Sequence, residues 1–217
     1  MGREECNIVP PGFPRRFFRQ LIVWSILVIA GFGILTQYSN TAGDDGAPSP
    51  QWPDTSSLVR SPDRATLVMF LHPHCPCSQA SLEELSRIVA HGGNCVGTHV
   101  VFVRPDHFPP LWEQTALWSA AVAMPGVQVN VDVDGVEARR FGVATSGSVL
   151  LFNASGLRLF NGGITGGRGH AGDNPGGSAV LSGLRTGRAK PDHAPVFGCP
   201  LLDREIPSIQ EVATCRT

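Results

Sequence analysis

The sequence predicts an α/β fold preceded by one N-terminal transmembrane helix. Three observations support this prediction. An uncharged apolar run lies near the N-terminus, short apolar segments alternate with helical periodicity from residue 65 onward, and two cysteines stand where a strand ends and a helix begins. With 42% hydrophobic and 16% charged residues, the 217-residue chain has the composition of a globular protein with a membrane segment added.

The apolar run covers residues 21–39 and is long enough to cross a bilayer. Three arginines lie just upstream, whereas the first charges downstream are aspartates. The positive-inside rule therefore places residues 1–20 in the cytoplasm and exports the rest of the chain. We expect a retained signal-anchor, because Ser39–Gly43 is only a weak cleavage site for a signal peptide. Cys6 would then be cytoplasmic, and the other five cysteines would face an oxidising compartment.

Residues 40–64 are rich in proline and small polar residues, which predicts a flexible linker. The domain is expected to span residues 65–187 and to open with a strand over 65–71. A helix should follow that strand and end at Gly92–Gly93; Ser81 and Glu84 match a capping box, but the first turn of the helix is expected nearer Pro76.

The rest of the domain continues the alternation of strands and helices. Turn residues at 153–156 join the last two strands as a hairpin. The expected elements are a strand at 99–103, a helix at 112–123, a strand at 127–133, a short helix at 137–141, strands at 149–152 and 157–160, a glycine-rich loop at 162–177, a short helix at 179–184 and an irregular tail at 188–217.

This order of elements resembles the thioredoxin fold over residues 65–184. The run Asp134–Val143 is similar to an "Asp-Gly…Ala-x-x-Phe-Gly-Val" segment of membrane-tethered bacterial thioredoxin-like proteins, and 151–156 is similar to their closing hairpin. Residues 75–78 together with 163–174 resemble the RedB-type group of these proteins. The resemblance implies a thiol-disulfide oxidoreductase on the bacterial inner membrane, with its domain in the periplasm or outside the cell. Its partners would be protein thiols or disulfides and an electron donor in the membrane.

Two features depart from the family pattern. The cysteine motif is Cys75-Pro76-Cys77, with one residue between the thiols in place of two. The family's cis-proline that faces the thiols is also missing, because residues 145–148 read Thr-Ser-Gly-Ser. In the family this proline shapes the surface for a partner's strand and crowds the thiols. Substrate geometry and metal exclusion therefore stay open.

Cys75 is the expected nucleophile. Pro76 suits the first position of a helix, which would make Cys75 an exposed N-cap residue. Unpaired N–H groups and the helix dipole at that position favour a thiolate. His74 is adjacent and His72 lies on the same loop, so a protonated imidazole would lower the thiol pKa further.

The resolving thiol is left open by the sequence. Cys77 is too near in the chain to bridge to Cys75 without strain. Cys199 is the alternative resolving thiol, or else it pairs with Cys215 to clamp the tail. Cys95 is expected to be structural or unpaired.

Copper binding is the alternative function. His72, His74, Cys75 and Cys77 form a compact set of soft and borderline ligands suited to Cu(I). A closed zinc site would need a second pair of ligands, which the spacing does not offer.

The glycine-rich loop adds two candidate supporting residues, Arg168 as a thiolate stabiliser and His170 as a proton carrier. The alternative is a hydrogen-bonded surface loop. Because the loop lacks the ending of a phosphate-binding loop, we expect no nucleotide and no cofactor. The net charge of −1 and the lack of a basic stripe argue against a nucleic-acid partner.

Overall fold

The computed structural model describes residues 15–202 and divides the chain into an N-terminal unit ending at Tyr38 and a domain beginning at Ser39. Cys6 and Cys215, and with them the pairing of Cys199 with Cys215, lie outside the described residues. Helix α1 (Arg15–Asn40) is long and apolar enough to cross a membrane and exposes its large apolar side chains. Its length and composition fit the predicted single-pass anchor.

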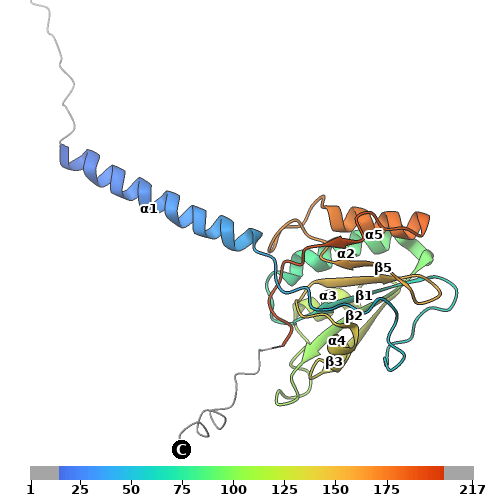
Figure 1. The fold of residues 1–217 in the computed structure, drawn as a ribbon. Helices are drawn as coiled ribbons and strands as arrows, with labels where there is room; N and C mark the ends of the chain where they lie inside the picture. The colour runs from blue at the N-terminus through green and yellow to red at the C-terminus, as the bar shows by residue number, and fades with distance from the viewer. Residues whose placement is uncertain (1–14, 203–217) are drawn as a thin grey trace, which may run out of the picture. The chain divides into compact units, whose positions relative to one another are not determined.

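The domain is built on a six-stranded sheet in the order β3-β2-β1-β4-β5-β6 (Figure 1). The first three strands are parallel, β4 runs antiparallel to β1, and β5 runs antiparallel to β4. This arrangement is that of the thioredoxin fold, and it confirms the predicted fold class. The strands are β1 (Ala65–Leu71), β2 (Val96–Arg104), β3 (Val127–Val133), β4 (Ser148–Phe152), β5 (Arg158–Gly162) and β6 (His193–Ala194).

Helices cover both faces of the sheet, with α2 and α5 on one side and α4 on the other (Figure 1). The buried strand β1 alternates accordingly: Leu67 and Met69 join the first core cluster, whereas Val68 and Phe70 join the second. The helices of the domain are α2 (Ser78–Gly92), α3 (Ala116–Val122), α4 (Val136–Phe141) and α5 (Pro175–Thr186), with a short 3₁₀ helix η1 (Gly93–Cys95).

The segments expected as a linker and a tail pack on the domain. The Trp52 ring contacts those of Phe141 and Phe152 edge-on, at centroid distances of 5.0 and 5.3 Å. Leu201 near the C-terminal end is buried in the same core cluster. These apolar residues are too few and too irregularly spaced to show a pattern in the sequence, yet together they cover the face that α4 leaves open.

Three helix boundaries differ from expectation. Helix α2 begins at Ser78, so the predicted capping box at Ser81 is wrong. Helix α3 begins only after Thr115, whose extended backbone interrupts the predicted helix. Helix α5 begins inside the predicted glycine-rich loop, because the Asn174 side chain accepts a hydrogen bond from Gly177 N–H and a proline follows it.

Candidate active site

Cys75 lies in a tight turn between β1 and α2. Its N–H donates to the carbonyl of His72 at 3.1 Å, and its carbonyl accepts from Ser78 N–H at 3.1 Å. Because of this turn the helix begins later in the chain, at Ser78, and Cys77 takes the N-cap position expected for Cys75. The side chain of Cys75 is also buried, with only 1% of its surface exposed, whereas an exposed thiol was expected.

The tail places Cys199 on Cys75. After β6 the chain runs antiparallel along residues 144–146: Ser146 N–H donates to the carbonyl of Cys199 at 2.8 Å, and Leu201 N–H donates to the carbonyl of Ala144 at 2.9 Å. A Cβ on Gly198 would lie 1.9 Å from the Ser146 carbonyl oxygen, so this approach requires glycine. The Cys75 and Cys199 Sγ atoms are then 3.0 Å apart, as unbonded thiols.

The three neighbouring thiols have different acidities. Burial raises the pKa of Cys75, but hydrogen bonds from the Cys199 thiol and backbone, from Ser78 and from the Cys77 backbone outweigh it and leave that pKa below its usual value. Burial and the nearby Cys75 raise the pKa of Cys199 to about 12. Burial and the charge of Cys75 also raise the pKa of Cys77. Cys75 is therefore the first of the three thiols to lose its proton as the pH rises.

Arg168 connects the thiols to two chain segments. Its guanidinium donates to the carbonyl of Gly198 in the tail and, at 3.2 Å, to that of Thr41 after α1. Its charge and hydrogen bonding lower the pKa of Cys77, in opposition to burial. The contacts give Arg168 a structural role, and its charge acts on Cys77 rather than on Cys75, so its suggested role as a thiolate stabiliser stays a prediction.

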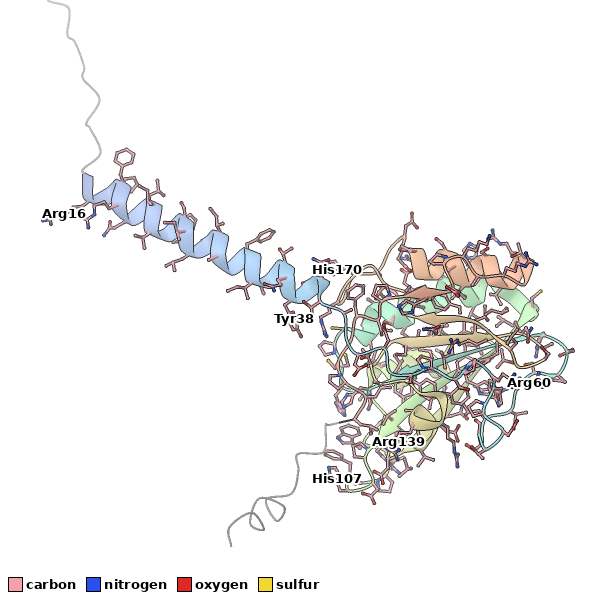
Figure 2. All side chains as sticks on the ribbon, in the orientation of Figure 1. Arg16, Tyr38, Arg60, His107, Arg139 and His170 are labelled. Atoms are coloured by element: carbon pink, nitrogen blue, oxygen red, sulfur yellow. The ribbon has the colours of Figure 1, made fainter. Side chains whose placement is uncertain are left out.

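His170 lies on the same loop as Arg168. Its ring nitrogen is 2.8 Å from the Arg168 carbonyl oxygen, a contact that closes the loop on itself. The ring is exposed at the end of the domain opposite Arg60 (Figure 2). The proton-carrier role suggested for His170 stays a prediction.

The two histidines before the thiols face an aromatic side chain. The rings of His72 and His74 lie against Trp112, at centroid distances of 5.7 and 4.4 Å, and His74 Nε2 is 3.2 Å from the Trp112 carbonyl oxygen. Across residues 15–202, no group of three or more His, Cys, Asp or Glu side chains is arranged to hold a metal ion. The four ligands of the copper alternative are therefore not assembled as one site.

Ser146 and Gly147 lie in the segment where the sequence lacks the cis-proline that thioredoxins carry. Gly147 has a φ of +92°, and its N–H donates to the Phe70 carbonyl at 2.8 Å. The Ser146 hydroxyl accepts from His72 N–H at 2.8 Å and lies 2.8 Å from the Ser78 hydroxyl. Sequence reasoning missed both serines, because isolated serines near a turn carry no distinguishing pattern.

Cys95, by contrast, is exposed at the end of η1, beyond the far end of α2. It stands apart from the cluster of three thiols and serves as an internal reference for an ordinary surface cysteine.

Comparison with known proteins adds evidence on the fold. No protein-family model and no curated protein matches the sequence. An uncharacterized conserved protein from Geobacillus kaustophilus aligns with a TM-score of 0.56 and 20% identity over 76% of this chain and 94% of that one. A hypothetical protein from Sinorhizobium meliloti aligns with a TM-score of 0.53 and 19% identity over 74% of this chain and 93% of that one. At these identities the similarity shows a shared fold.

Proposed function

We propose that the protein is a membrane-tethered thiol-disulfide oxidoreductase whose exchanging pair is Cys75 and Cys199. The observation that carries the proposal is the 3.0 Å separation of their Sγ atoms across 124 residues of sequence. A disulfide needs its sulfurs about 2.05 Å apart, so a small movement of either side chain closes the bond. Two thiols brought this close from distant segments are difficult to explain by packing alone.

The acidities of the pair suit disulfide exchange. The lowered pKa of Cys75 provides a thiolate, which is the species that attacks disulfides and also the better leaving group. Once Cys75 is a thiolate, Cys199 keeps its proton and donates a hydrogen bond to it, which lowers the pKa of Cys75 and raises that of Cys199. The net reaction interconverts this dithiol with its disulfide, while a partner protein's disulfide and dithiol change places by the same two electrons and two protons.

Cys77 is the weaker candidate for the second thiol. It is separated from Cys75 by one residue, and its pKa is raised by burial and by the charge of Cys75. In this proposal Cys77 shapes the turn and the local charge, while α1 keeps the domain near its membrane electron partner.

Thiol trapping on the full chain in detergent tests the proposal. The protein is oxidised with oxidised glutathione, its free thiols are blocked, and its disulfides are mapped by mass spectrometry in the wild type and in Cys75→Ser, Cys77→Ser and Cys199→Ser. We expect a Cys75–Cys199 disulfide and exchange activity in the wild type and in Cys77→Ser, and neither in the other two variants. Cys95→Ser is the matched control and should behave as the wild type. Full activity of Cys199→Ser would contradict the proposal.

Copper binding is tested by Cu(I) titration of the wild type and of two histidine variants. The histidines face Trp112, so His72→Ala and His74→Ala are expected to leave Cu(I) affinity unchanged. Tight stoichiometric Cu(I) binding that either substitution abolishes would restore the copper alternative.

A further inference from the structure

We infer that Cys199, and not Cys75, is the sulfur that a partner protein attacks. The inference rests on the proposed function, because it concerns the Cys75–Cys199 disulfide. In this inference Cys199, in the C-terminal segment, is the sulfur that contacts the partner. Cys75, in the turn before α2, bonds only to Cys199. The partner it implies is a protein dithiol, which leaves the encounter as a disulfide.

Access to solvent distinguishes the two sulfurs. Cys75 is 1% exposed, and Cys77 beside it is 9% exposed. Cys199 is partly exposed and lies on the outer segment that covers Cys75. A thiolate attacks a disulfide by direct contact with one sulfur, so access decides which sulfur is attacked. A partner reaches Cys199 from solvent, whereas contact with Cys75 requires the turn or the tail to move.

The surroundings of Cys75 suit a leaving group. When the disulfide breaks, the departing sulfur carries a negative charge, and hydrogen bonds from Ser78 and from the backbone of Cys77 and Cys199 receive that charge. A thiol with a lower pKa leaves faster. Cys199 would be the poorer leaving group, because burial and the neighbouring Cys75 raise its pKa.

The exchange is balanced without a further reactant. A partner thiolate attacks Cys199 Sγ, a partner–Cys199 disulfide forms, and the Cys75–Cys199 bond breaks with Cys75 leaving as a thiolate. The partner's second thiolate then attacks the partner sulfur of the mixed disulfide. The partner's own disulfide forms, the partner–Cys199 bond breaks, and Cys199 leaves and takes a proton. The partner is oxidised by two electrons, and the pair is reduced.

The tail keeps the mixed disulfide in place during the exchange. The Cys199 carbonyl is bound by Ser146 N–H, and the adjacent Gly198 carbonyl is bound by Arg168. Because the backbone is held on both sides of the thiol, Cys199 stays beside Cys75. A thiol with a raised pKa is also a weak nucleophile at neutral pH, so reduced Cys199 attacks partner disulfides slowly. The direction of exchange is set by Cys75: hydrogen bonds that stabilise its thiolate favour the reduced pair over the disulfide, and therefore favour oxidation of the partner.

Site mapping with glutathione tests this inference. Full-length protein in detergent is oxidised with oxidised glutathione, freed of reagent and mixed with one equivalent of reduced glutathione. Samples are quenched in acid after short times, denatured, blocked with N-ethylmaleimide and mapped by mass spectrometry. Labelling after denaturation makes the blocking step independent of burial. We expect glutathione on Cys199 and maleimide on Cys75 to exceed the reverse pattern by about tenfold or more.

The outcomes separate the two proposals. If the Cys75–Cys199 disulfide forms but glutathione is found on Cys75, or equally on both sulfurs, the inference is wrong and the proposed function stands. If that disulfide never forms, the proposed function itself fails. Cys77→Ser repeats the measurement without the third thiol of the site and should give the same pattern. Cys95 reports the reactivity of an exposed thiol in every sample.

Discussion

Oxidation of the Cys75–Cys199 pair is expected to stabilise the domain strongly. The two cysteines are 124 residues apart, and the loop-closure relation gives a limit of about 5 kcal/mol for a cross-link of that span. Native-state strain lowers the realised gain, so we expect about 2–4 kcal/mol. For a domain of this size that gain raises the unfolding temperature by roughly 5–15 °C.

Unfolding of the full chain in detergent, followed by tryptophan fluorescence with and without a reductant, measures this effect. Cys77→Ser should keep the difference between oxidised and reduced protein, whereas Cys199→Ser should show none. Cys75→Ser removes the other sulfur of the same disulfide and should likewise show no difference between oxidised and reduced protein. Equal stability of the oxidised and reduced wild type, with the disulfide verified by mass spectrometry, would refute the reasoning.

Three further substitutions and one pH profile of the wild type test the site and the packing of the tail. Cys199→Ala removes the hydrogen bond that helps to hold the pKa of Cys75 below its usual value, so that pKa should rise. Thiolate absorbance against pH measures this shift without regard to access, and an unchanged titration would exclude the hydrogen bond. The Cys75 thiolate is needed for the closing step, in which it displaces glutathione from a Cys199–glutathione mixed disulfide, so the rate of that step in the wild type should rise with pH and level off below the pH expected for an ordinary cysteine. Arg168→Gln removes the link to the tail and should slow disulfide formation several-fold. Arg168→Lys should not restore the rate, because the guanidinium contacts two carbonyls. Wild-type rates in both variants would show that the tail is held by other means. Leu201→Ala should cost about 2–5 kcal/mol of unfolding free energy, because this side chain is 1% exposed in the core. The half-buried Leu202→Ala is its control, and equal losses in the two variants would contradict the packing described for Leu201.

Five of the six strands could be predicted from the sequence because they are local apolar runs, whereas β6, in the tail expected to be irregular, is only two residues long and carries no pattern. The strands at 65–71 and 127–133 match the prediction at both ends. Helices were predicted less accurately where tertiary contacts set their limits. Trp112 looked helical by composition, yet it lies before α3 with its ring against His74. Asn174 followed by proline is a start signal for α5, but the surrounding glycines led to the prediction of a loop there.

The site could be predicted only in part, because its members meet through the fold. The placement of the thiols of Cys75 and Cys77 between strand and helix follows from local pattern. The contact with Cys199 depends on how the tail crosses residues 144–146, and no periodicity encodes that path. Burial of Cys75 arises from the same crossing. Because the sequence does not reveal this path, the thiol was expected to be exposed.

The long separation of Cys75 and Cys199 in the sequence also affects how the site is assembled during synthesis. Ribosomes add about 5–20 residues per second, so the 124 residues after Cys75 take roughly 6–25 s to follow it. During synthesis, Cys75 thus leaves the ribosome well before Cys199 does. Cys77 is its neighbour throughout this interval, and a bond between the two would be strained and readily exchanged. The arrival of the tail is therefore the step that completes the site, and the order of synthesis makes it the last.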